Sequence, residues 1–291
     1  MKEQNLRLGI LLMCVTSFIF SVQDGLSREL GERYPVFMIV MIRYWFFALF
    51  VMAMAARSAG GLRAAVRTAY PLQQIARGLL LSTEICVMVV AYVRLGLIET
   101  HAVFASYPLL VAALSGPVLG EKVGWRRWAA IAVGFVGVVI ILNPTGTVFS
   151  PLALIPMLAA FMFALYGLLT RFVAQKDPAS VTFFWAGVVG AVLMTPLGLS
   201  QWQWMTPHDA LLMGILCCTA ATAHYLMIRA FEVAEASALQ PFAYLQIAFI
   251  SFIGVTIFNE VLRANVVAGA ALVIAAGIFT IWRTRVRAKA S

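Results

Sequence analysis

Two charged residues, Arg43 and Glu84, stand inside long apolar stretches of this sequence, where an isolated charge is costly. A charged side chain at the centre of a membrane-spanning helix costs about 2.5–3.5 kcal/mol even on the insertion scale that gives the lowest values. The two residues could form a structural ion pair across neighbouring antiparallel helices, or Arg43 could snorkel to polar groups. Alternatively, Glu84 is a proton or cation site that Arg43 tunes.

Histidine is the other residue type here that is suited to moving protons, because it titrates near neutral pH. His101 lies beside Glu99 at the start of one apolar stretch, His224 lies near the end of another, and His208 lies in an expected loop. Each is expected to be a histidine satisfied at the membrane interface, with His101 and His224 also candidates for a solute path. The three histidines lie at different depths and the four cysteines show no ligand spacing, so no metal site and no cofactor are expected.

Aromatic and amide side chains within the apolar stretches could form the wall of a cavity for an amphipathic solute. Their alternative role is packing, with each tyrosine hydroxyl on a neighbouring backbone carbonyl. Neutral hydrogen bonds from Gln246 would suit a zwitterion better than a strongly charged ion. The residues expected to contact a substrate are Glu84, His101, Tyr107, Tyr166, Trp185, His224, Tyr244 and Gln246.

The composition shows which elements must position these residues. The 291 residues are 63% hydrophobic and 11% charged, whereas soluble domains are about 25% charged. Soluble, disordered, coiled-coil and secreted disulfide-rich proteins are therefore excluded. Apolar stretches of about 20 residues, each long enough to cross a membrane, lie near 8–27, 35–56, 75–95, 100–119, 126–142, 151–171, 179–199, 209–229, 236–258 and 264–282. They lack the alternation of barrel strands, so the sequence predicts an all-α polytopic membrane protein with ten transmembrane helices.

The net charge of +9 is explained by membrane topology. With the amino terminus inside, the inside segments hold 16 of the 21 Lys and Arg residues; Arg28, Arg33, Arg94 and Arg263 fall outside, and Arg43 falls within a helix. Cytoplasmic loops carry an excess of Lys and Arg, so both termini are expected in the cytoplasm. The basic excess then needs no nucleic-acid partner. The expected location is a bacterial cytoplasmic (inner) membrane, in contact with lipid.

The sequence contains an internal repeat. The segment from Ser17 to Pro35 matches the segment from Ala160 to Pro178, so that Arg28 corresponds to Arg171. A second match pairs Glu121 with Glu260; each glutamate is expected to cap the helix that follows it. The halves are residues 1–146 and 147–291. Each half has five helices, an odd number, so the second half enters the membrane from the opposite side, as in transporters built from inverted repeats.

Several segments together resemble a known family. They are IRYWFFAL from Ile42, the P-x12-E spacing from Pro108 to Glu121, and GAALVIAAG from Gly269. Their order resembles the ten-helix EamA-type exporters of the drug/metabolite transporter superfamily. STEICVMVVAYVRLG from Ser82 and ASYPLL from Ala105 resemble the YddG-type amino-acid exporters within it. The resemblance implies that the third, fourth, eighth and ninth helices line a central cavity and that the fifth and tenth are peripheral.

These observations predict a secondary transporter that exports small metabolites, most specifically amino acids, by alternating access. The alternative is a transporter, in either direction, of another small solute such as a nucleobase, a vitamin or an organic cation. An intramembrane enzyme is a remote alternative, because the sequence has no HExxH, no GxSxG and no phosphate-binding loop. Since ten helices can enclose a path, the protein is expected to work as a monomer.

Overall fold

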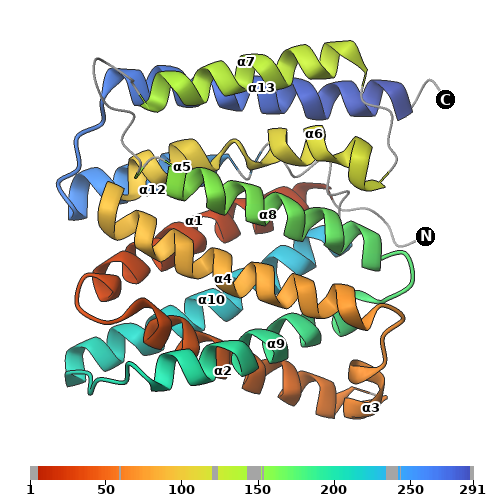
Figure 1. The fold of residues 1–291 in the computed structure, drawn as a ribbon, viewed down its shortest axis with the longest axis vertical. Helices are drawn as coiled ribbons and strands as arrows, with labels where there is room; N and C mark the ends of the chain where they lie inside the picture. Colours follow the sequence, from red (N-terminus) through yellow and green to blue (C-terminus); the bar gives the residue numbers. More distant parts are fainter. Residues whose placement is uncertain are drawn as a thin grey trace.

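The structure of this protein is a computed structural model that describes residues 6–58, 60–119, 124–142, 152, 154–233, 242 and 244–288. Within these residues all regular secondary structure is helical (Figure 1). Seven helices are long and apolar enough to cross a membrane, and shorter apolar helices occupy 128–141, 245–257 and 264–279. Together they account for every expected span, so the prediction of an all-α membrane protein is confirmed.

The helices follow one another with short connections. Their bounds are α1 (Leu6–Gly31), α2 (Val36–Arg57), α3 (Gly61–Val66), α4 (Pro71–Leu95), α5 (Leu97–Phe104), α6 (Tyr107–Leu119), α7 (Trp125–Leu142), α8 (Leu154–Val173), α9 (Ala179–Leu199), α10 (Pro207–Val233), α12 (Leu245–Ile257) and α13 (Ala264–Ala288). The short helix α3 was not expected. The boundary between residues 146 and 147 and the side chain of Glu121 lie outside the described residues.

The fourth expected span is not one continuous helix. It divides at Ala105 and Ser106 into α5 and α6, and α5 begins three residues earlier than expected. Pro108 has no N–H to donate to the carbonyl of Phe104, and proline is tolerated only in the first turn of a helix. The helix therefore restarts at Tyr107. For the ninth expected span, 236–258, only the part from Leu245 to Ile257 can be compared.

The two halves pack on each other reciprocally. Helix α1 packs on α10 and α12, and α8, which begins the second half, packs on α4 and α6. Helix α2 pairs with α9, and α7 pairs with α13. In Figure 1, α1 runs from right to left and α8 from left to right. Exchange of the halves therefore reproduces these contacts, as expected for inverted repeats.

Helices α7 and α13 form an outer layer of the bundle, at the top of Figure 1. Their backbones approach closely where Gly137 faces Gly269: a Cβ on Gly269 would lie 2.5 Å from the Gly137 carbonyl oxygen and 2.9 Å from the Ile141 amide nitrogen. Small residues at such positions allow two helices to pack closely. Gly134 and Gly277 instead face inward, toward Leu109 and Tyr244.

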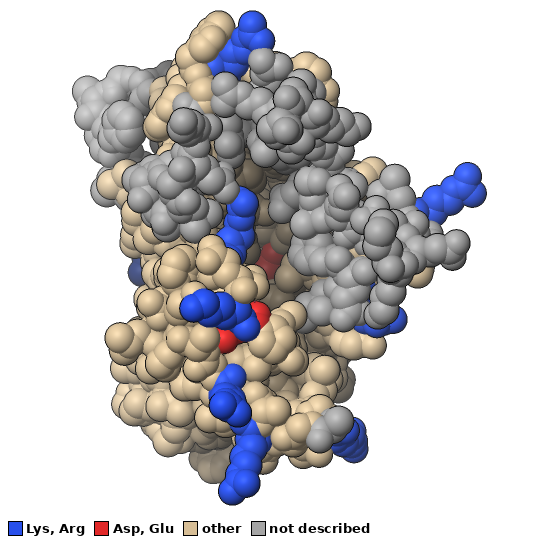
Figure 2. Space-filling model, turned by 90° about the vertical axis from the view of Figure 1, so that its right-hand side faces the viewer, with Lys and Arg blue, Asp and Glu red and all other residues tan. Residues whose placement is uncertain are grey.

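The start of α1 and the end of α13 lie at the same edge of the bundle, on the right of Figure 1. We call this the basic face. Figure 2 shows it with Lys and Arg side chains spread over it and few Asp and Glu, which lie near its middle. Exposed basic residues at the helix ends and loops of this face include Arg57, Arg63, Arg67, Arg126, Arg171, Lys176 and Arg229. The other end of the bundle is called the opposite face.

The substitution Gly269→Ala tests the close contact of α7 with α13. The added methyl group would meet backbone atoms that cannot rotate away, so we expect a loss of about 1–3 kcal/mol in the free energy of unfolding. Gly214→Ala on α10 is the matched control, because a Cβ there would have no atom within 4 Å. Melting of the purified variants in detergent measures both. Equal melting temperatures for the two variants would show that this contact is not tight.

Candidate functional site

A cavity of about 150 Å³ lies in the middle of the bundle. Seven helices line it: α1, α2, α4, α5, α8, α10 and α12. Its polar lining residues are Gln23, Asp24, Arg43, Glu84, His101 and Gln246. Phe20, Tyr92, Phe104, Phe163 and His224 are the aromatic ones. The expected cavity helices all contribute, and α1, α2 and α8 contribute as well.

Asp24, His101 and Gln246 meet at one end of this cavity. His101 Nε2 lies 3.1 Å from Asp24 Oδ2, and the Gln246 amide donates to the same oxygen at 3.0 Å. His101 Nδ1 lies 3.1 Å from the carbonyl oxygen of Leu97, and the imidazole stacks on Tyr92 at 5.3 Å between centroids. Asp24 and His101 are 6% and 4% exposed. This cluster joins α1 and α5 of the first half to α12 of the second.

Arg43 and Glu84 line the same cavity but form no ion pair with each other. The Arg43 guanidinium donates to Ser27 Oγ on α1 at 3.4 Å, and Ser27 Oγ donates to the carbonyl of Gln23 at 2.8 Å. Glu84 is 4% exposed, and it makes no hydrogen bond or ion pair in the part of the chain that the structure describes. A carboxyl group thus faces the cavity without a hydrogen-bonding partner among the described residues.

Aromatic rings gather in two groups beside the polar centre. His224 packs between Phe20 at 5.2 Å and Phe47 at 6.1 Å, with Phe183 next to it at 6.5 Å. On α5 and α8, Phe104 packs on Phe163 at 5.4 Å. The cavity therefore offers flat apolar surfaces as well as charged and amide groups.

The remaining expected site residues lie at different distances from this centre. Tyr107 and Tyr244 line a smaller neighbouring cavity of about 50 Å³, together with His101 and Gln246. Tyr166 lies beneath the guanidinium of Arg77, at 5.0 Å, and does not line either cavity. Trp185 lies away from both, where its indole donates to the carbonyl of Val66 at 3.2 Å.

Sequence reasoning missed Asp24 and Arg77. The first helix was expected to end near residue 27, which made Asp24 a residue of the helix end, whereas α1 continues to Gly31. The signal was present in the adjacent polar residues Gln23 and Asp24 within an apolar helix. Arg77 was counted as a charge of the inside loop, but it is 1% exposed and bonds Thr170 Oγ1 at 2.9 Å and Gln74 Oε1 at 2.6 Å.

On the opposite face, Glu260 closes the end of the bundle. Its carboxylate accepts hydrogen bonds from the amides of Leu97 at 2.6 Å and Ile98 at 2.9 Å, and it pairs with Arg28. Arg28 also lies over the ring of Phe258 at 4.3 Å. Glu260 was expected to cap the helix that follows it, and this expectation is wrong. It caps α5 of the other half, because the first amides of α5 point at it and have no helical partner of their own.

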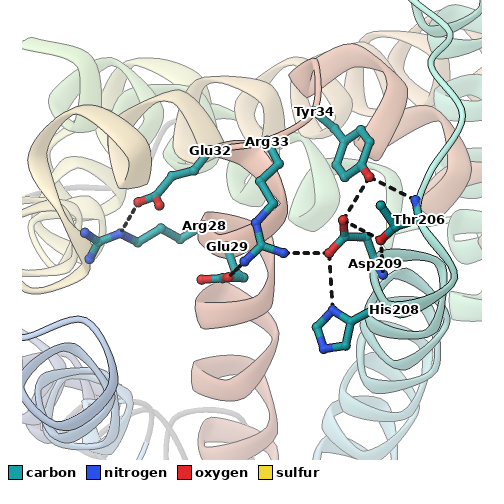
Figure 3. A network of polar contacts seen from close by, with 8 residues as sticks. All are labelled: Arg28, Glu29, Glu32, Arg33, Tyr34, Thr206, His208 and Asp209. Atoms are coloured by element: carbon teal, nitrogen blue, oxygen red, sulfur yellow. Dashed lines mark hydrogen bonds and ion pairs between the residues drawn. The ribbon is translucent and has the colours of Figure 1, made fainter.

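Figure 3 shows a second contact between the halves on this face. Asp209, at the start of α10, accepts from the hydroxyls of Tyr34 and Thr206, each at 2.9 Å, and from Arg33 at 2.6 Å. His208 Nδ1 lies 3.4 Å from the same carboxylate. These bonds hold the end of α1 against the start of α10.

The same junction is repeated near the basic face, between the end of α8 and the start of α4. The Asp177 carboxylate accepts from the backbone amide of Ala69 at 2.8 Å, from the side-chain amide of Gln74 at 2.8 Å and from the Thr68 hydroxyl. Burial raises the pKa of Asp177, but these hydrogen bonds and the charge of Arg77 outweigh burial and leave the pKa below its ordinary value. The junction therefore favours the ionised carboxylate.

Glu260→Ala tests the contact that closes the opposite face. It leaves two amides of α5 without an acceptor and Arg28 without its buried partner, so we expect a loss of about 3 kcal/mol in the free energy of unfolding. Glu32→Ala is the matched control, because Glu32 also pairs with Arg28 but its side chain is 44% exposed. An exposed pair contributes about 0–1 kcal/mol. Melting in detergent should separate the two variants, and a loss as small as that of Glu32→Ala would contradict the assignment.

The Asp177 junction predicts a dependence of stability on pH. A carboxyl with a lowered folded-state pKa stabilises the fold above its unfolded pKa, about 3.9, and that contribution is lost as pH falls through the folded pKa. At pH 7 the melting temperature of the wild-type protein should be higher than that of Asp177→Asn, and the difference between them should shrink below about pH 4. The exposed-residue control Glu32→Gln should follow wild type throughout. A difference between wild type and Asp177→Asn that stays constant from pH 7 to 3 would contradict this account.

Comparisons with known proteins agree with this architecture. The EamA-like transporter family matches residues 7–143 and 151–282. The chain is 26% identical to an S-adenosylmethionine uptake transporter of Rickettsia prowazekii, over 94% of this chain and 90% of that protein. It is 29% identical to a riboflavin transporter of Rhizobium johnstonii, over 93% and 90%. A crystal structure shares the fold with a TM-score of 0.65 at 18% identity, covering 94% of this chain and 96% of the other. The chain belongs to the EamA-like transporter family and is a transporter of small molecules, not an enzyme.

Proposed function

We propose that this protein takes up a small metabolite that carries a planar heteroaromatic ring, through the central cavity and by alternating access. The observation that supports this most is the lining of the cavity, where charged and amide groups occur together with aromatic rings. An aromatic face stacks well on a heteroaromatic ring, at about 1–3 kcal/mol per ring where bases bind proteins. Glu84, which has no partner in the described chain, is placed to receive a donor or cationic group of the solute, and Arg43 an acceptor.

The relatives support this class of solute over the amino acids expected from the sequence. S-adenosylmethionine and riboflavin both join a planar heteroaromatic ring system to a polar tail. The relative from Rickettsia prowazekii is moreover an uptake transporter. Export of amino acids, the main expectation from the sequence, is therefore replaced here by its alternative, transport of a vitamin-like or nucleoside-like solute.

The basic face is assigned to the cytoplasm by the excess of Lys and Arg there, which puts both termini inside. The two repeats, residues 1–146 and 147–291, then rock about the midplane cavity as one unit each, and a single chain encloses the path. In this proposal Glu260 and Asp24 close the end away from the cytoplasm, and the cavity exchanges solute with the cytoplasmic side.

Uptake assays test the solute class. Proteoliposomes loaded with unlabelled compound should accumulate labelled S-adenosylmethionine or riboflavin by exchange, and unlabelled compounds of the same class should compete. Phenylalanine and an aliphatic amino acid complete the panel. Exchange of the amino acids without exchange of either heteroaromatic compound would replace this proposal with the amino-acid alternative.

Phe163→Ala tests the role of the aromatic lining. Loss of one stacking partner should weaken the apparent affinity about 5- to 100-fold. Phe161→Ala is the matched control, because Phe161 is on the same helix two residues away but is 40% exposed and does not line the cavity. The affinity of each variant comes from competition curves in the exchange assay. An equal effect of the two substitutions would argue against stacking in the cavity.

A further inference from the structure

We propose that Asp24 and His101 form the proton-coupling site of this transporter: they share one proton while the opposite face is closed, and they exchange it once in each transport cycle. The inference rests on the proposed transport function and adds its driving force. It follows from the hydrogen bonds, the charges and the position of the pair.

The hydrogen bonds require a proton between the two side chains. The Leu97 carbonyl can only accept, so His101 Nδ1 at 3.1 Å from it carries a hydrogen. In a neutral imidazole the other nitrogen, Nε2, is then an acceptor. An ionised Asp24 would place a second acceptor 3.1 Å from it. The contact is favourable only when one proton is added, on His101 Nε2 or on Asp24 Oδ2.

The charges around the pair lead to the same conclusion. The titratable and charged groups that face this part of the cavity are Arg43 from α2, Glu84 and Tyr92 from α4, and His224 from α10. Helix α8 contributes Phe163 and α12 contributes Gln246, which are uncharged. The cavity has one arginine, Arg43, and two carboxyl groups, Asp24 and Glu84. Arg43 balances one of them, so the cavity needs one further proton to be neutral, and the contact of Asp24 with His101 can hold it. Without that proton, the cavity would hold an uncompensated negative charge in apolar surroundings, which is costly.

The position of the pair links its proton to the movement of the helices. His101 lies one turn inside α5 from the amides that Glu260 caps, and Asp24 lies one turn before Arg28 on α1. Gln246 of α12 bonds the same Asp24 oxygen, and Ser21 of α1 donates to the Gln246 carbonyl at 3.3 Å. The helices that must separate to open the opposite face are thus the ones that the pair joins.

A coupling sequence follows from this arrangement. Loss of the proton through the cavity to the cytoplasm leaves two acceptors facing each other and weakens the contact of α5 with α1. Opening of the opposite face then hydrates Asp24, which takes up a proton from that side. The pair re-forms and closes the face again. One proton moves inward per cycle, which would drive uptake of the solute.

The first test needs no substrate. Infrared difference spectra of the purified protein, recorded between pH 5 and 9, should contain a carboxyl or imidazolium band from the shared proton. That band should be absent from both Asp24→Asn and His101→Gln, because each group holds the proton only with the other. Glu99→Gln is the matched control: Glu99 lies on α5 two residues before His101 and pairs with Arg263 on the surface. A band that is unchanged in both variants would overturn the proposal.

The second test uses proteoliposomes with labelled S-adenosylmethionine or riboflavin. A gradient that is acidic outside should stimulate net uptake by wild type and Glu99→Gln, and both Asp24→Asn and His101→Gln should lose this stimulation. Exchange without a gradient shows whether each variant still transports. Stimulation that persists in both variants would overturn the proposal. If the two variants lose exchange as well, the infrared band decides whether Asp24 and His101 share a proton. Failure of wild type to exchange either compound would refute the proposed solutes and leave the infrared result standing.

Discussion

A polar group in apolar surroundings is stable only where another group of the protein satisfies it, and the arrangement of this bundle depends on that constraint. Sequence-distant side chains meet because each supplies what the other lacks. Glu260 accepts from amides of α5 more than 160 residues away in the chain, and Asp177 accepts from the residues that begin α4. Each of these contacts can form only when the helices have the right position. They therefore fix the positions of these helices relative to one another.

The contacts between the halves are related in pairs, and this relation is informative about mechanism. Asp209 holds α10 to the end of α1, and Asp177 holds α4 to the end of α8. The carboxylate changes place between the two junctions. Asp209 lies at the start of α10, whereas Asp177 lies in the loop that follows α8. The repeats have kept the place of the contact and changed its chemistry. The polar residues of the cavity differ more between the halves. His101 and both carboxyl groups come from the first half, and the second half supplies Gln246 and His224. Such an asymmetric centre inside a symmetric frame allows the two faces to respond differently to protons.

Much of the fold could be predicted because hydrocarbon thickness sets the length of each helix and apolar runs of that length are easy to recognise. The errors have local causes. Pro108 divides the fourth span, a break that its position in the run could have indicated. The site was harder to predict, because residues 24, 101 and 246 have no periodic relation to one another. Glu84 was identified because a buried charge stands out in an apolar run, whereas Asp24 was assigned to a helix end and Trp185 to the cavity. Whether a residue on a membrane helix faces lipid, a neighbour or a cavity depends on the rotation of that helix, which a nearly uniform apolar sequence does not reveal.

The sequence by itself determined that this chain crosses a membrane repeatedly, that it consists of two related halves, and that a few buried polar residues need partners. These properties depend on composition and on spacing along one chain. Only the tertiary structure decided which partners those residues have: Ser27 and not Glu84 for Arg43, Asp24 for His101, and the first turn of α5 for Glu260. The physical reason is that hydrogen bonds and ion pairs act over about 3 Å, so their pairing depends on how helices distant in sequence are placed and rotated against each other.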